Sequence, residues 1–234
     1  MRRTSDGRDK TMYCVIVGDI VNSREMDFET REAATRAVKA TLNGINTKYK
    51  DVILADFGIV RGDALEGVLT EPSYAPRILP EIIRNLYRAQ KVTLRFSVVI
   101  DELSVVSNDR NEADGPAFHT ALEKLDTLKA RKSDHWLQVS FVTNTVEQPL
   151  VDGLFDLLTA LTGGWTDRQR EIAWAMDESA RKQSAVSEAL GISPPAVSKQ
   201  LRAMCYDQYA YAWIRLEVYL LDLEKKIERE PVAV

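Results

Sequence analysis

Residues 182–204 read KQSAVSEALGISPPAVSKQLRAM, and they carry the clearest structural signal in the chain. Val186 and Leu190 give a first short helix an apolar face, and Gly191 permits the left-handed turn that must follow it. Ser193 can cap a second helix that has a proline in its first turn. The segment therefore predicts two short helices packed across a glycine turn, the helix-turn-helix arrangement.

The outward face of the second predicted helix is polar. This segment resembles the helix-turn-helix of many bacterial regulators, in which the second helix enters the major groove of DNA. The resemblance implies DNA as a partner and gives a set of candidate contacts: Lys182, Ser193, Ser198, Lys199 and Arg202. The same unit also serves as a protein contact, and that alternative stays open.

The charge of the whole chain limits how DNA could be bound. The sequence has 31 Lys and Arg residues against 35 Asp and Glu residues, which gives a net charge of −4. A protein with this balance has no general attraction to phosphate, so the charge excludes a broadly basic nucleic-acid-binding protein. Any contact with DNA must come from a local patch of cations.

A long helix is predicted after this segment, at about 205–229, because apolar residues recur at alternating spacings of three and four. They are Tyr206, Tyr209, Trp213, Leu216, Leu220, Leu223 and Ile227. Such a seam packs against another helix. Since helix-turn-helix regulators usually dimerise to read paired half-sites, we expect the seam to contact a second copy. Packing against the apolar stripe at 150–161 of the same chain is the alternative.

The first part of the chain alternates between strand-like and helix-like segments. Strands are expected at 13–21, 52–60, 64–69, 92–100 and 136–143, and helices at 28–49, 78–89 and 116–128. This order predicts an α/β (α+β) layer, a ferredoxin-like or palm-type sheet with helices on one face. We expect a loosely ordered N-terminus over 1–11, the palm-like domain over 12–147 and an all-α domain over 148–234.

Two aspartates in the first part of the chain are candidate site residues because of their positions relative to the predicted strands. Asp19 lies near the end of the first predicted strand, and Asp63 lies at the tip of the predicted hairpin. In palm-type domains such carboxylates lie side by side and can hold Mg²⁺ and a nucleoside triphosphate. With Arg24 and Arg61 they form a candidate metal or nucleotide site, although ordinary turn chemistry explains the same residues. The acidic pair at 101–102 is a further candidate for this cleft.

The segments GDIVNSR, RGDALEG, and LRFSVVI followed by DGPAFHTALEKL are similar in order and spacing to class III nucleotide cyclases and GGDEF proteins. The whole layout, with GDI-x-x-SR near the start and a C-terminal helix-turn-helix, resembles the SatD family of bacterial proteins. The chain departs from cyclases at Ile59, where a basic residue would contact the purine. It offers His119 and Glu123 where a cyclase has Asn and Arg. These departures remove stabilisation of transition-state charge, so we assign no catalytic residue and favour a ligand sensor over an enzyme.

These observations favour a cytoplasmic, homodimeric DNA-binding regulator of the SatD type, whose palm-like domain senses a phosphorylated ligand or mediates assembly. No apolar run approaches the length of a membrane span, and the start MRRTSDGRDK lacks the apolar core of a secretory signal. The first alternative is a metal-dependent nucleotidyl-transfer or cyclase-like enzyme with a C-terminal dimerisation module. The second is a protein-interaction scaffold.

Overall fold

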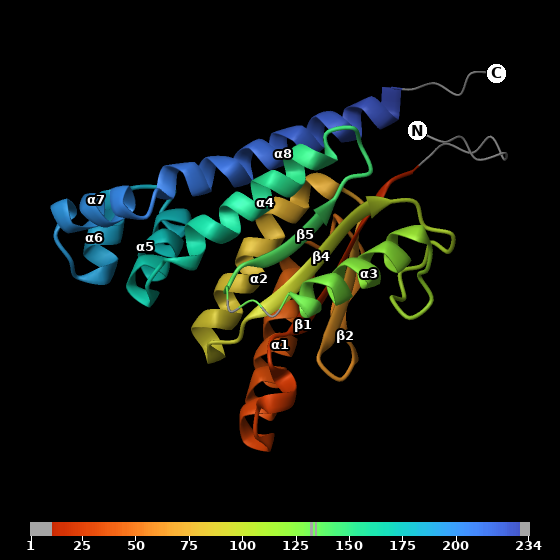
Figure 1. Ribbon diagram of the computed structural model, residues 1–234, viewed down its shortest axis with the longest axis horizontal. Helices are drawn as coiled ribbons and strands as arrows, with labels where there is room; N and C mark the ends of the chain where they lie inside the picture. The colour runs from red at the N-terminus through yellow and green to blue at the C-terminus, as the bar shows by residue number, and fades with distance from the viewer. Residues whose placement is uncertain (1–10, 132, 134, 230–234) are drawn as a thin grey trace.

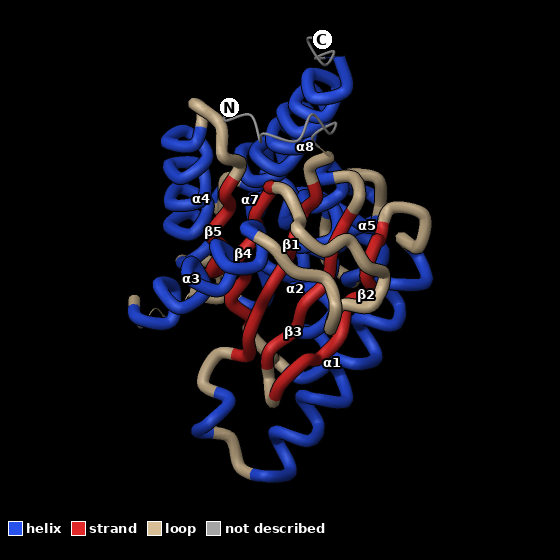
Figure 2. The backbone as a smooth tube through the Cα atoms, turned by 90° about the vertical axis from the view of Figure 1, so that its right-hand side faces the viewer, coloured by secondary structure: helices blue, strands red, loops and turns tan. Residues whose placement is uncertain are grey.

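The computed structural model describes residues 11–131, 133 and 135–229. The loosely ordered N-terminus expected over 1–11 lies outside these residues except for Thr11. The first part of the chain forms a five-stranded sheet with the order β2-β3-β1-β4-β5, which can be followed in Figure 2. Its strands are β1 (Tyr13–Ile20), β2 (Ile53–Arg61), β3 (Ala64–Leu69), β4 (Leu94–Asp101) and β5 (Gln138–Val142).

The pairing of the strands matches the palm-type class expected from the sequence. β1 lies between β3 and β4 and is antiparallel to both, and β2 and β3 form the expected hairpin. β5 is parallel to β4, because a helix connects the two strands and returns the chain to the same end of the sheet. The mixed α/β fold class is therefore confirmed.

Helices cover both faces of this sheet. α1 (Phe28–Lys48) and α2 (Ala75–Gln90) lie on one face, and α3 (Pro116–Ala130) lies on the other (Figure 1). The expectation of helices on one face is thus wrong for α3. The reason lies in β1, where Cys14 and Ile16 face the first layer while Val15 and Val17 face α3. Because β1 is apolar on both sides, both sides must be covered.

α2 begins earlier than the sequence analysis expected, at Ala75 rather than Ile78. A short 3-10 turn, η2 (Pro72–Tyr74), precedes it directly. Pro76 was expected to lie before the helix, but a proline within the first turn costs no hydrogen bond, because that amide would have no helical acceptor.

The second part of the chain is entirely helical. Its helices are α4 (Gln148–Gly163), α5 (Asp167–Glu178), α6 (Gln183–Leu190), α7 (Pro194–Ala203) and α8 (Tyr206–Arg229). Thr166 and Gln169 form a capping box at the start of α5. Buried residues of the sheet, of α2 and of the C-terminal helices belong to one continuous apolar cluster. The division into domains at 147/148 stays a prediction, since the two parts share this core.

The apolar seam of α8 packs within its own chain. Its residues from Tyr206 to Leu220 are at most 7% exposed, and Leu223 and Ile227 are partly buried. α8 runs along α2, η2 and α4 (Figure 1). The expectation that this seam contacts a second copy is therefore wrong. A seam of this spacing specifies a helical neighbour, and here the neighbours are in the same chain.

Among the residues that the structure describes, no helix combines the length and the apolar character that a membrane span requires.

Candidate functional site

Two short helices joined by a glycine turn form the helix-turn-helix predicted at 182–204. α6 ends at Gly191, which has a φ of 62° and closes the helix in the left-handed conformation. Nothing lies within 4 Å of the Cβ that another residue would have there, so the requirement for glycine comes from the backbone conformation alone. Ser193 caps α7, since its hydroxyl oxygen accepts a hydrogen bond from the backbone N–H of Ala196.

The two helices divide into a buried side and a free side. Val186 of α6 and Val197 of α7 are fully buried, and both helices pack against each other and against α5. The side chains of Lys182, Lys199 and Arg202 are exposed, and none of them forms an ion pair with a residue that the structure describes. The candidate cations are therefore available to bind phosphate or base edges. Of the two serines in the candidate set, Ser193 is exposed and Ser198 is half-buried.

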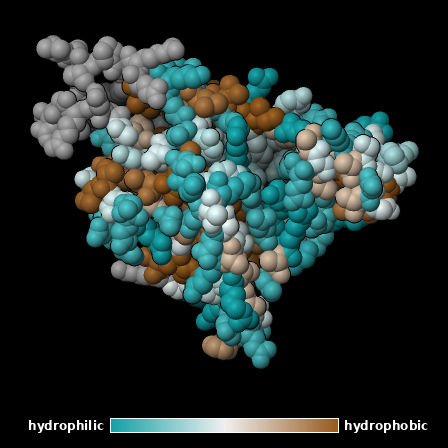
Figure 3. Space-filling view, turned by 180° about the vertical axis from the view of Figure 1, so that it is seen from behind, coloured by the Kyte–Doolittle hydropathy of each residue, from teal (hydrophilic) through white to brown (hydrophobic). Residues whose placement is uncertain are grey.

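The local charge around these helices differs from that of the whole chain. Residues 179–204 contain four Lys or Arg residues and one carboxylate, Glu188. α7 itself carries no acidic residue. This end of the molecule projects away from the sheet in Figure 1 and forms a separate lobe at the right of Figure 3. The segment 179–204 thus has a local excess of positive charge, unlike the chain as a whole.

The two candidate aspartates of the palm domain lie next to each other. Asp19 is opposite Ala64 in the pairing of β1 with β3, and Asp63 immediately precedes Ala64. The charge of Asp63 acts directly on Asp19. The Ser23 hydroxyl donates a hydrogen bond to Asp63, which ties the hairpin to the loop after β1. The hairpin thus brings together the pair of carboxylates that the sequence predicted.

Two cations that the sequence analysis missed neutralise Asp19. Arg95 lies opposite Asp19 on β4, with Nε 3.4 Å from Oδ1. Lys129, in the last turn of α3, places Nζ 3.7 Å from Oδ2. Gly18 allows this approach of β1 and β4, since a Cβ there would lie 2.9 Å from the Arg95 carbonyl oxygen and 3.0 Å from the Phe96 ring. A charged residue inside the apolar strand VTLRFSVVI was the signal that could have revealed Arg95.

The remaining candidates for this cleft differ in their positions relative to the carboxylate pair. Arg24 is exposed and, within the described part of the chain, forms no ion pair with Asp19 or Asp63. Arg61 is the last residue of β2, and its side chain lies outside what the structure describes. Asp101 pairs with Tyr13 at the opposite end of β1, because β1 and β4 are antiparallel. The candidate pair at 101–102 therefore lies away from Asp19 and does not join the cleft.

Burial shapes the electrostatics of Asp19, which is 7% exposed. Burial raises the pKa of its carboxyl group above the ordinary value, Arg95 and Lys129 oppose the rise, and Asp63 adds to it. Ionised Asp19 is therefore held at a cost to stability. Carboxyl groups with a shifted pKa of this kind concentrate at functional sites.

Mg²⁺ is the ion that the cyclase resemblance implies at this site. The donors present are the carboxylates of Asp19 and Asp63, and Mg²⁺ commonly binds one or two carboxylates with phosphate oxygens and water. Oδ1 of Asp19 is buried and forms no hydrogen bond with a described residue, so it retains acceptor capacity. In the part of the chain that the structure describes, no group of three or more His, Cys, Asp or Glu side chains gathers. The residues thus fit Mg²⁺ only together with a ligand that brings its own oxygen atoms.

Substitution of Asp19 tests whether its ionised carboxylate destabilises the fold. We expect Asp19→Asn to raise the free energy of unfolding at neutral pH by up to roughly 1 kcal/mol, a modest change for a point substitution. A carboxyl group whose pKa is higher in the folded than in the unfolded state destabilises the fold once it ionises. The gain in stability should vanish below pH 3.8, the ordinary pKa of an aspartate, because the carboxyl group is then protonated in both the folded and the unfolded state.

Urea unfolding of both proteins at neutral pH and in acid measures this difference. Asp156→Asn, which changes an exposed carboxylate on α4, is the matched control. A loss of stability in Asp19→Asn at neutral pH would show instead that the ion pairs with Arg95 and Lys129 outweigh burial.

Comparison with known proteins places the chain in a family. The model of the SatD family matches residues 13–212, which include the carboxylate pair and the helix-turn-helix. The chain belongs to the SatD family. No curated protein matches this SatD protein.

Three solved structures are similar to the SatD chain at low sequence identity. The catalytic core of a rhodopsin-guanylyl cyclase with converted specificity, in complex with ATPalphaS, has a TM-score of 0.40 and 16% identity over 51% of this chain and 74% of that chain. A monomeric guanylyl cyclase domain from the aquatic fungus Blastocladiella emersonii has a TM-score of 0.37 and 13% identity over 51% and 77%. A regulator of polyketide synthase expression from Bifidobacterium adolescentis has a TM-score of 0.26 and 12% identity over 95% and 83%.

Proposed function

We propose that this SatD protein is a DNA-binding regulator that reads the major groove with α7. The observation that carries the proposal is the free cationic face of the helix-turn-helix. Lys199 and Arg202 are exposed on α7 and form no ion pair with a described residue, while Lys182 stands at the start of α6. A helix pair that served only to pack against another part of the chain would have this face covered.

The positions of the candidate residues indicate which of them would contact bases and which would contact phosphates. The first turn of a recognition helix meets base edges, and cations further along and beside it contact phosphates. Ser198 and Lys199 lie in the second turn of α7, nearer to its start than Arg202, and would contact bases, whereas Arg202 and Lys182 would contact phosphates. Ser193 acts through its cap, which fixes where α7 begins.

A homodimer is part of the proposal, because paired half-sites give helix-turn-helix proteins most of their specificity. The seam of α8 is buried within the chain, so the contact between two copies would use another surface.

Competition binding tests the proposed function. The full chain is incubated with a labelled fragment from upstream of its own coding region, and unlabelled competitors of the same or of random sequence are added. We expect the specific competitor to be effective at a concentration at least about 1,000-fold lower, as for other specific DNA-binding proteins. Equal competition by both would contradict a regulator that recognises sequence.

We propose binding of a Mg²⁺-nucleotide at Asp19 and Asp63 as a second function, that of the sensed ligand. The adjacency of the two carboxylates supports it, with Arg95 and Lys129 as cations able to meet phosphate. Binding of ATP and GTP, followed with and without Mg²⁺, tests it. We expect Mg²⁺-dependent binding that Asp63→Asn abolishes, and binding unaffected by that substitution would contradict the site.

A further inference from the structure

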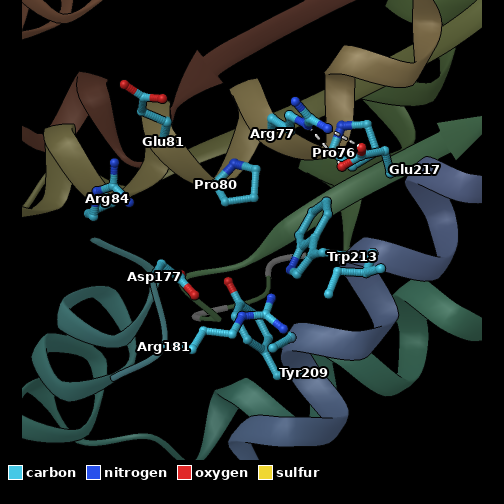
Figure 4. A pocket seen from close by; sticks show the side chains of 12 residues that line it. Pro76, Arg77, Pro80, Glu81, Arg84, Asp177, Arg181, Tyr209, Trp213 and Glu217 are labelled. Carbon is cyan, nitrogen blue, oxygen red and sulfur yellow. Dashed lines mark hydrogen bonds and ion pairs between the residues drawn. The ribbon is translucent and has the colours of Figure 1, made fainter. Parts of the chain in front are cut away.

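A cavity separate from both sites lies where the palm part and the helical part meet. α2 forms one wall, α8 forms another, and the end of α5 closes it (Figure 4). Its volume is about 280 Å³, near the lower end of the range for small-molecule pockets. We call it the junction pocket. Its apolar lining includes Pro80, Ile214 and the indole ring of Trp213.

The acceptor groups that line the junction pocket already have donors. Asp177 accepts a hydrogen bond of 2.7 Å from the hydroxyl of Tyr206. Glu81 accepts hydrogen bonds from Lys48 and Tyr49, and Glu217 is paired with Arg77. Because the carboxylates in the wall already have partners, they do not favour binding of a cationic ligand.

Two donor groups of the junction pocket, on Trp213 and Arg181, are in the opposite state, whereas Arg77 and Arg84 are paired with carboxylates. Nε1 of Trp213 is buried and forms no hydrogen bond of normal geometry with a described residue, although the Tyr209 hydroxyl lies close enough to interact with it. Trp213 is 7% exposed, and its indole nitrogen points toward Tyr209 and Arg181 in Figure 4. Arg181 is exposed and forms no ion pair with a residue that the structure describes. A buried donor without a well-aligned acceptor is costly, so this wall is suited to an acceptor group of a ligand.

We propose that the junction pocket binds a small organic carboxylate with a compact apolar body. The carboxylate accepts hydrogen bonds from Nε1 of Trp213 and from the guanidinium group of Arg181. The apolar body lies against Pro80 and Ile214. A carboxylate supplies the missing acceptor and matches the fork of the guanidinium group, whereas a neutral amide of the same shape supplies a weaker acceptor. Because α2 belongs to the palm part and α8 continues from the helix-turn-helix, such a ligand contacts both parts.

The indole signals of the protein provide the test. The chain has four tryptophans, and the Nε1 groups of Trp136 and Trp165 already donate to the carbonyl oxygens of Thr162 and Met204. In protein labelled with ¹⁵N at the indole nitrogens, Trp213→Phe identifies the signal of Trp213. Titration with benzoate should move that signal downfield in a saturable way, with a Kd on the order of 0.1–1 mM, as ligand efficiency allows for so small a molecule.

Two controls separate this site from unspecific binding. Arg181→Gln should weaken benzoate binding by at least about tenfold, the effect of losing a charged hydrogen bond, while Lys182→Gln removes a neighbouring cation outside the pocket and should leave it unchanged. Benzamide, the neutral analogue, should bind at least about tenfold more weakly than benzoate. A Trp213 signal that does not move with benzoate, an equal response to benzamide, or full affinity in Arg181→Gln would each overturn the proposal.

Discussion

Replacement of both recognition-helix cations, Lys199→Ala/Arg202→Ala, should lower affinity for the upstream DNA fragment by at least about 100-fold. Each lost contact to a base or phosphate costs on the order of 1–3 kcal/mol, and the two side chains lie on one exposed face of α7. The fold should be unaffected, since both side chains are exposed and neither forms an ion pair or hydrogen bond within the described chain. Fluorescence anisotropy with labelled DNA measures the change.

The matched control removes two exposed cations from the palm part instead. Lys39→Ala/Lys50→Ala lowers the net charge by the same amount. Both residues are exposed, one in α1 and one just after it, and α1 lies apart from α7 in Figure 1. This control should bind DNA about as well as the wild type. Equal losses in both double variants would mean that binding reflects overall charge, and the assignment of α7 as the recognition helix would fail.

Removal of a buried seam residue of α8, Leu220→Ala, should lower the free energy of unfolding by about 2–5 kcal/mol, because the cavity it leaves cannot close fully. Leu220 has no exposed surface and belongs to the core that α8 shares with α2 and α4. The loss should be the same at protein concentrations that differ widely, since the contacts lie within one chain. Urea unfolding at two protein concentrations measures both quantities.

The neighbouring residue provides the control for this experiment. Leu221 is 37% exposed, so Leu221→Ala should cost no more than about 1 kcal/mol. A midpoint for Leu220→Ala that falls steeply on dilution while the wild type stays constant would indicate that the seam stabilises a dimer, contrary to the packing described above.

The strands and most helices could be predicted from the sequence because their patterns are local. β1 is a run of apolar residues, and the helix-turn-helix is specified by Gly191 and Ser193 within a single short segment. The partner of the α8 seam could not be predicted in this way. Spacing fixes which residues of a helix are buried but does not identify the neighbour, and here the neighbours include α2, more than a hundred residues earlier.

The candidate site was predictable only in part for a similar reason. Asp19 and Asp63 follow from motif positions, and the hairpin does bring them together. Arg95 and Lys129 come from β4 and from the end of α3, and they reach Asp19 only because of strand register and the placement of α3 on the second face of the sheet. The junction pocket is lined by residues from three helices, so it could not be predicted from any single segment of the sequence.

The proposal that α7 contacts DNA is tested most directly by titrating the full chain with its upstream fragment at low and moderate salt. Two phosphate contacts from one copy, by Lys182 and Arg202, give a slope of about −1.8 in log K against log salt, a loss of about 12-fold between roughly 50 and 200 mM. We predict saturable binding with at least this salt dependence, and a slope that is less negative by about 1 in Lys199→Ala/Arg202→Ala, which loses one phosphate contact. Absence of binding at the lowest salt would contradict the account.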